Sequence, residues 1–232
     1  SMAGPNAAGS LILLQEHYTK LKPGSFMRSS TLKGLAIHAA DEAGGTPGPD
    51  YTFGWGLMNV QRAAAIISSA VTSNNASTSD HLLYENVLNT GETFTKTVVA
   101  TGKVPLSATI AWTDPPGTIN TDAASNLNDR TAKLVHDLDI KITRNTQTFL
   151  PWALDPASPS SAASKRVNNV DNVERIDVDS TVPGATYTIT VNHKGTLARG
   201  TQAYALIISG AGGVSYGSSA SLTSGAKIDS LS

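Results

Sequence analysis

The sequence predicts an α+β chain, in which a helical N-terminal piece is followed by an all-β sandwich of the jelly-roll type. Up to about residue 70, Ala-rich and Leu-rich segments alternate with capping and turn residues. From Ser79 onward, short runs rich in Val, Ile, Thr and Tyr are separated by Gly, Pro, Asn and Asp, which is typical of antiparallel sheets. The polar segment between these halves, residues 73–79, predicts a domain boundary.

Three helices account for the first half. The first runs from Ser1 or Met2 to about Leu21, where Lys22-Pro23-Gly24 stops it. The second follows the potential caps Ser29 and Ser30 and extends towards Ala43. The third begins at Asn59, a good N-cap, and runs to about Ala70.

Eight strands are expected in the second half, which suits a jelly roll or a related sandwich. The predicted organisation is therefore residues 1–75, residues 76–210 as the β-sandwich, and a Gly- and Ser-rich tail over residues 211–232. The strands are expected at 81–88, 92–99, 107–112, 134–143, 148–152, 172–178, 186–192 and 202–209.

The amino-acid composition excludes several classes of binding partner and of site for this chain. Seventeen Lys plus Arg against 18 Asp plus Glu give a net charge of −1, so no long-range field attracts nucleic acid or an anionic membrane. The apolar runs are much shorter than the roughly 20 residues of a membrane span. With no Cys, thiolate metal sites and disulfide scaffolds are excluded. The low charged fraction of 15%, with abundant Ser, Thr, Asn and Gly, leans towards a secreted, extracellular protein.

The chain opens with Ser1-Met2-Ala3-Gly4-Pro5 at the start of a predicted helix. A serine hydroxyl in this position lies beside unpaired backbone N–H groups, which can hold a developing oxyanion. Ser-Met is also what an expression tag can leave behind, and a five-residue motif at a chain end is short.

Further motifs follow in order, and together they resemble the closing segments of the subtilisin family of serine proteases. They are Leu32-Lys33-Gly34-Leu35-Ala36-Ile37-His38, Gly48-Pro49-Asp50-Tyr51 and Gly54-Trp55-Gly56-Leu57-Met58-Asn59. Later segments, such as Ala111-Trp112-Thr113-Asp114-Pro115 and His136-Asp137-Leu138-Asp139, resemble the β-sandwich appended to one group of alkaline subtilisins. The helical piece would then be the C-terminal part of an α/β catalytic domain.

The resemblance implies a Ser-His-Asp triad with Ser1 as the nucleophile and protein or peptide substrates. In this family the Asp, the His and the oxyanion-hole Asn precede the Ser, so an upstream segment of the same protein would supply them. The histidines of this chain are expected to be structural or surface residues, and the chain alone is expected to be inactive. Asn6 stands where many members have His.

A metal site is a second hypothesis. Alternation along residues 134–143 places Asp137 and Asp139 on one face of a strand, and oxygens from Asp171 or from Asp114, Asp129 or Asn172 would complete a Ca²⁺ site. Calcium is common in the sandwich domains of the resembled family. A solvated polar face is the simpler reading, and it stays open.

The alternative to a protease is a non-catalytic module, in which the β half binds calcium, glycans or a partner surface. Trp55 and Trp112 are expected as core anchors and Trp152 at a strand end, although exposed tryptophans would favour sugar binding.

Overall fold

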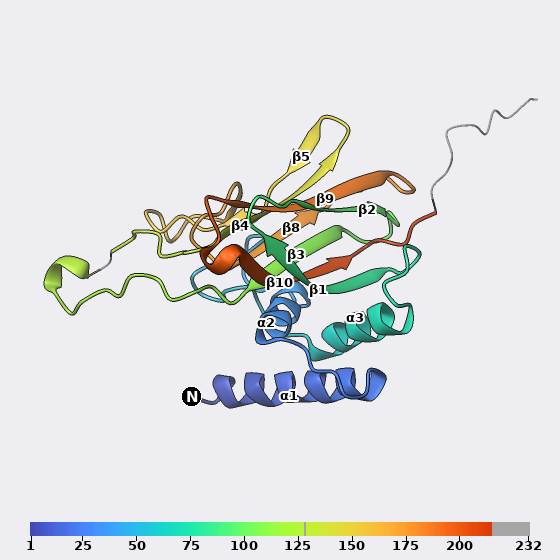
Figure 1. The fold of residues 1–232 in the computed structure, drawn as a ribbon, viewed down its shortest axis with the longest axis horizontal. Helices are drawn as coiled ribbons and strands as arrows, with labels where there is room; N and C mark the ends of the chain where they lie inside the picture. The colour runs from blue at the N-terminus through green and yellow to red at the C-terminus, as the bar shows by residue number, and fades with distance from the viewer. Residues whose placement is uncertain (128, 215–232) are drawn as a thin grey trace, which may run out of the picture.

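The computed structural model describes residues 1–127 and 129–214 (Figure 1). Three helices come first, and strands dominate the rest. The helices are α1 (Ala3–Leu21), α2 (Ser29–His38) and α3 (Val60–Thr72). Asn59 caps α3, because its Oδ1 accepts a hydrogen bond of 2.8 Å from the backbone N–H of Arg62. Gly24 closes the end of α1 with a φ of 76°, a conformation that suits glycine.

The strands form two antiparallel four-stranded sheets. The first has the order β1 (His81–Asn89), β10 (Thr201–Ser209), β3 (Leu106–Trp112), β8 (Val173–Val178). The second has the order β2 (Phe94–Val99), β9 (Thr186–Lys194), β4 (Asp137–Arg144), β5 (Gln147–Phe149). A short pair, β6 (Trp152–Ala153) and β7 (Ser164–Lys165), and two 3₁₀ turns, η1 (Ala124–Asn126) and η2 (Ala198–Gly200), complete the elements of the described residues.

The two sheets bury one core between them. Trp112, Leu206 and Ile208 of the first sheet and Leu138, Ile189 and Val191 of the second belong to the same buried cluster. Burying this much apolar surface is the main favourable contribution to the stability of the fold.

A second core lies on the other face of the first sheet. Ile207 and Leu83 pack there against Leu35 of α2 and Ile67 of α3. Figure 1 shows α2 and α3 lying along this sheet, with α1 beyond them as the outermost element. The layers are therefore α1, the α2 and α3 pair, the first sheet and the second sheet.

The predicted fold class is wrong. The described residues form one small, mostly β, α+β fold without a closed barrel, rather than a helical piece of an α/β domain followed by a separate all-β sandwich. The physical reason lies in the first sheet, where every residue of β3 is buried and β10 is apolar on both faces. Such a sheet needs a layer on each side, and the helices supply the second one.

Two local boundaries also differ. The second helix ends at His38 and not near Ala43, because the chain turns there into a bridge between Asp41 and Leu57. The strand expected from residue 134 begins at Asp137. The tail predicted over residues 211–232 falls largely outside the described residues.

Candidate functional site

Ser1 lies exposed beside the amino end of α1. Met2 occupies the N-cap position and makes no side-chain capping bond. The first backbone N–H groups of a helix have no intrahelical partner, so this end of α1 can donate to a negative charge. The space around Gly4 is open, since no atom of the described residues comes within 4 Å of the position that a Cβ would take. The hydroxyl and the donors are therefore accessible together.

The first half of α1 is apolar but uncovered. No charged side chain occurs before Glu16, and Met2, Ile12 and Leu13 are 88%, 68% and 60% exposed. Leu11 packs partly on the helical core, and Leu14 is the first buried side chain of the helix. The stretch before Leu14 is uncharged, with Asn6 and Ser10 as its polar side chains, and contiguous exposed apolar groups often mark an interaction surface. The first turns of α1 thus present a surface of the kind that another polypeptide segment covers.

No described histidine is available to Ser1 as a general base, because each one is bonded elsewhere in the fold. His17, four turns along α1, has its Nε2 2.7 Å from Ser68 Oγ. The other imidazoles lie in the sheets and at their contact with the helices, where they bond as follows: His38 and His81 to Ser209, His136 to Gln202, and His193 to the backbone of Gly91.

The contact between helices and first sheet contains a hydrogen-bonded chain of polar groups that the sequence did not reveal. His38 Nδ1 lies 2.8 Å from Thr109 Oγ1, and His38 Nε2 lies 2.7 Å from Ser209 Oγ. The same Ser209 oxygen is 2.8 Å from His81 Nδ1. Burial, reinforced by the positive charge of Arg175, lowers the pKa of His38 to about 3. His38 is therefore neutral at pH 7 and joins the two layers.

A saturated carboxylate lies next to this chain. Asp177 accepts hydrogen bonds from Ser107 Oγ at 2.6 Å, Trp152 Nε1 at 2.8 Å and Arg175 Nε at 3.1 Å. Although burial opposes ionisation, these donors and the Arg175 guanidinium keep the pKa of Asp177 below its ordinary value. Both groups line a cleft of about 620 Å³ between the helical layer and the strands. Because their bonds are satisfied within the protein, we interpret them as structural.

The predicted metal ligands are only partly brought together. Asp137 and Asp139 lie on one face of β4, as alternation predicted, but Lys194 Nζ bridges them at 2.9 Å to each carboxylate. Asp171 lies in a loop before β8 and accepts a hydrogen bond of 2.7 Å from Asn168 Nδ2. Within residues 1–127 and 129–214, no three His, Asp or Glu side chains are grouped so as to hold a metal ion. The two aspartates therefore have an internal counter-ion in Lys194, and calcium binding stays a prediction.

A buried glutamate next to this pair was missed. Glu174 of β8 is fully buried, and its Oε2 accepts a bond of 2.8 Å from the backbone N–H of Ile140 on β4. Its Oε1 and Asp137 Oδ1 are buried without a partner in the described part of the chain. Burial raises the pKa of Glu174 to about 9. The hydrogen bond from Ile140 lowers the pKa, whereas the negative charges of Asp139 and Asp137 raise it further. The signal in the sequence was weak, because β8 also carries Arg175 and Asp177, and only alternation with Ile176 and Val178 places Glu174 on the buried face.

The tryptophans follow their predictions in part. Trp112 is buried in the core between the sheets. Trp152 is half-buried and packs on Gly48. The Lys165 Nζ atom lies over its ring, 4.7 Å from the ring centroid. Trp55 is half-buried beside Arg175 and Asp177, so it is not a full core anchor.

We compared the sequence with protein-family models and with curated proteins. Neither a protein-family model nor a curated protein matches this sequence. Among the described helices, none is both long and apolar enough to cross a membrane.

Proposed function

We propose that this chain is the C-terminal part of a secreted serine endopeptidase of the subtilisin type, with Ser1 as the nucleophile. The His and Asp of the triad and the Asn of the oxyanion hole would come from an upstream segment of the same protein. The observation that carries the proposal is the position of Ser1 at the amino end of a helix whose first three turns are uncharged and expose Met2, Ile12 and Leu13. The ordered motifs from Ser1 to Asn59 support it.

The chemistry follows from this position. Ser1 Oγ attacks the scissile carbonyl while the upstream histidine takes its proton, and the amine leaves as the histidine returns that proton. The carbonyl oxygen carries the negative charge of the tetrahedral intermediate, and the unpaired N–H groups at the start of α1 stabilise it. Water then releases the acyl group by the reverse sequence. The uncovered face of α1 is the surface on which the upstream segment would pack and bring its side chains to Ser1.

The test uses the full-length protein. Ser1→Ala should lower kcat for a protein substrate by about 10⁴-fold or more, because the nucleophile is lost while binding is retained. Ser10→Ala, on the same helix, is the matched control and should leave kcat within about twofold. Equal activity of the wild-type protein and Ser1→Ala would remove the proposal.

The alternative is a calcium-binding module without catalysis, and one observation favours it. Asp137 Oδ1 and Glu174 Oε1 are buried carboxylate oxygens that find no hydrogen-bond partner among the described residues, and such oxygens are unusual in folded proteins. A cation placed there would have to displace or accompany Lys194. Calcium therefore stays a prediction, and its test is given in the Discussion.

A further inference from the structure

The first sheet ends in an incompletely paired edge. β1 has β10 on one side and, among residues 1–127 and 129–214, no strand on the other. The N–H and C=O groups of Leu83 bond to Asn75 and therefore point away from β10. In an antiparallel pair the backbone groups of every second residue point to the same side, so those of Glu85, Val87 and Asn89 point outward as well. The outward groups of these four residues are the ones that a further strand would use.

Part of this edge is already closed by side chains. Asn75 Nδ2 donates to the carbonyl of Leu83 at 2.9 Å, and Asn75 Oδ1 accepts from its N–H at 2.8 Å, as a paired strand residue would. Glu92 accepts from the N–H of Asn89. The N–H and C=O groups of Glu85 and Val87 have no hydrogen bond to the described residues. Two alternate residues of β1 are thus open.

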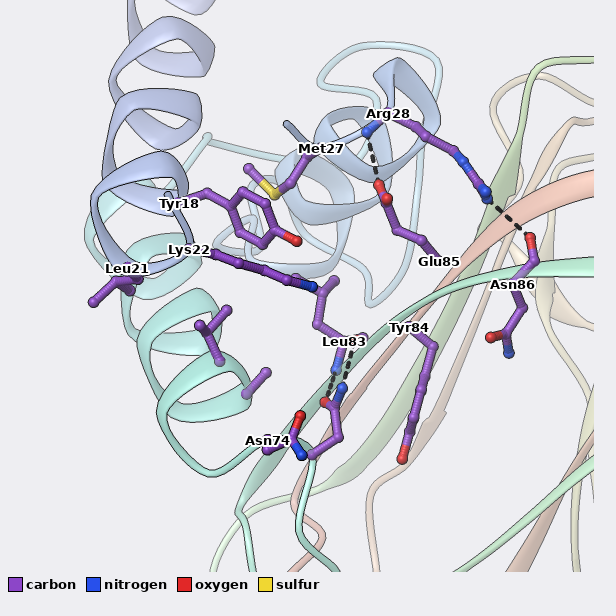
Figure 2. Close-up of a pocket in the computed structure, with 13 residues that line it drawn as sticks. Tyr18, Leu21, Lys22, Met27, Arg28, Asn74, Leu83, Tyr84, Glu85 and Asn86 are labelled. Carbon is purple, nitrogen blue, oxygen red and sulfur yellow. Dashed lines mark hydrogen bonds between the residues drawn. The ribbon is translucent and has the colours of Figure 1, made fainter. Parts of the chain in front are cut away.

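A pocket of about 640 Å³ adjoins the open edge. Figure 2 shows Tyr18 and Lys22 from the end of α1 reaching towards Leu83, with Tyr84, Glu85 and Asn86 of β1 along the other side. Leu21, Met27 and Leu83 give the pocket an apolar floor.

The charge of the pocket is positive. Lys22 and Arg28 contribute two cations, and no carboxylate of the described residues lies within 4.0 Å of either side-chain charge. The single carboxylate of the lining is Glu85, and its Oε1 is taken up by the backbone N–H of Arg28 at 2.6 Å and by the hydroxyl of Thr31. The lining therefore has an excess of one positive charge.

We propose that this pocket and the edge of β1 at Glu85 and Val87 bind an extended peptide segment that carries an acidic side chain. The peptide adds a strand to the first sheet through its backbone, the mode in which main-chain bonds give affinity and a side-chain pocket gives specificity. A side chain on the helix side of the added strand enters the pocket, and its carboxylate pairs with Lys22. The proposal is independent of Ser1 and of proteolysis.

The test measures fluorescence anisotropy of a fluorescein-labelled peptide of alternating Val and Glu with the whole 232-residue chain. The same peptide with Lys in place of Glu tests charge, and a version N-methylated at alternate residues tests strand pairing. We expect the Glu peptide to bind at least about tenfold more tightly than either, because each comparison removes a paired charge or backbone bonds.

Matched variants locate the site. Lys22→Glu should weaken binding of the Glu peptide by about tenfold or more, whereas Lys20→Glu, the same charge change outside the pocket, should change it less than about twofold. Both side chains are exposed, so both variants should keep the melting temperature of the parent chain. Hydrogen exchange should show that the peptide protects the amides of Glu85 and Val87. Absence of binding, equal binding of the three peptides, or equal effects of the two variants overturns the proposal.

Discussion

The two sheets and the helical layer differ in how completely they are closed. The sheets enclose a core of about twenty buried side chains, with large groups such as Trp112 and Tyr187 fully covered. The helical layer covers only the second half of α1 and leaves its first turns bare. The difference shows that the described residues close the core between the sheets but leave exposed side chains on the first turns of α1, where the proposed upstream segment would pack.

Neighbouring leucines on α1 give the largest expected contrast. Leu14→Ala should lower the free energy of unfolding by about 2–5 kcal/mol, because Leu14 is 1% exposed in the helical core. Leu13→Ala should change it by less than about 0.5 kcal/mol, because Leu13 is largely in solvent. Urea unfolding of both variants measures the difference, and similar losses would mean that the first half of α1 is already covered.

Glu174→Gln tests the core between the sheets. The pKa of Glu174 is about 9 in the folded protein and 4.5 for an ordinary, solvated Glu, so between these values Glu174 holds a proton that the unfolded chain releases. Stability should therefore fall as pH rises from 4.5 towards 9, by at most about 1.4 kcal/mol per pH unit. The Gln variant should lose this slope and be more stable than the parent at pH 8. An unchanged slope in denaturation between pH 5 and pH 8 would show that Glu174 is ionised when folded.

His38 should give the opposite dependence at the contact between helices and sheet. The pKa of His38 is about 3 in the folded protein and 6.5 for an ordinary, solvated imidazole, so between these values the unfolded chain binds a proton that the folded protein does not. Stability should decrease as pH falls from 6.5 towards 3, again by at most about 1.4 kcal/mol per unit. His38→Gln keeps polar atoms near Thr109 and Ser209. In this variant, stability should no longer fall as pH is lowered below 6.5, whereas the dependence of stability on pH above 7 should be unchanged. If the slope below pH 6.5 persists in the variant, the imidazole is not its source.

Of these variants, Lys194→Ala should have the smallest effect on stability and the largest effect on calcium binding. Removing it by Lys194→Ala should cost less than about 1 kcal/mol, because its bridges to Asp137 and Asp139 are partly exposed. If these aspartates hold Ca²⁺, the variant should show a larger rise in melting temperature on adding CaCl₂ than the parent does. Lys20→Ala serves as the control, since it removes the same type of side chain from an exposed ion pair with Glu16 that is not part of the predicted calcium site. No rise in either protein would remove the calcium hypothesis.

Periodicity and caps predicted most of the elements. Pro23-Gly24 correctly predicted the end of the first helix, and Asn59 correctly predicted the start of the third. Most strands lie within a few residues of their expected ranges. The layer arrangement was not predictable in the same way. A run such as Ala205-Leu206-Ile207-Ile208 shows that β10 is covered on both faces, but only three-dimensional contacts show that α2 and α3 are the cover.

The site was predicted to a smaller extent. Ser1 was placed at its helix end from a local motif, and Asp137 and Asp139 share a face because strand alternation is local. The partners of these groups are distant in sequence. Lys194 lies 57 residues from Asp137 in the chain, and Ser209 lies 171 residues from His38. No spacing rule on a single sequence identifies such pairs.

The most direct test of the central claim is fluorophosphonate labelling of the folded full-length protein, followed by peptide mapping. If the exposed face of α1 is covered by a segment that supplies a histidine to Ser1, the label should be found on Ser1, and protein unfolded in urea before the reagent is added should not be labelled. Labelling at another serine, or none in a protein that is folded and contains Ser1, would contradict the account.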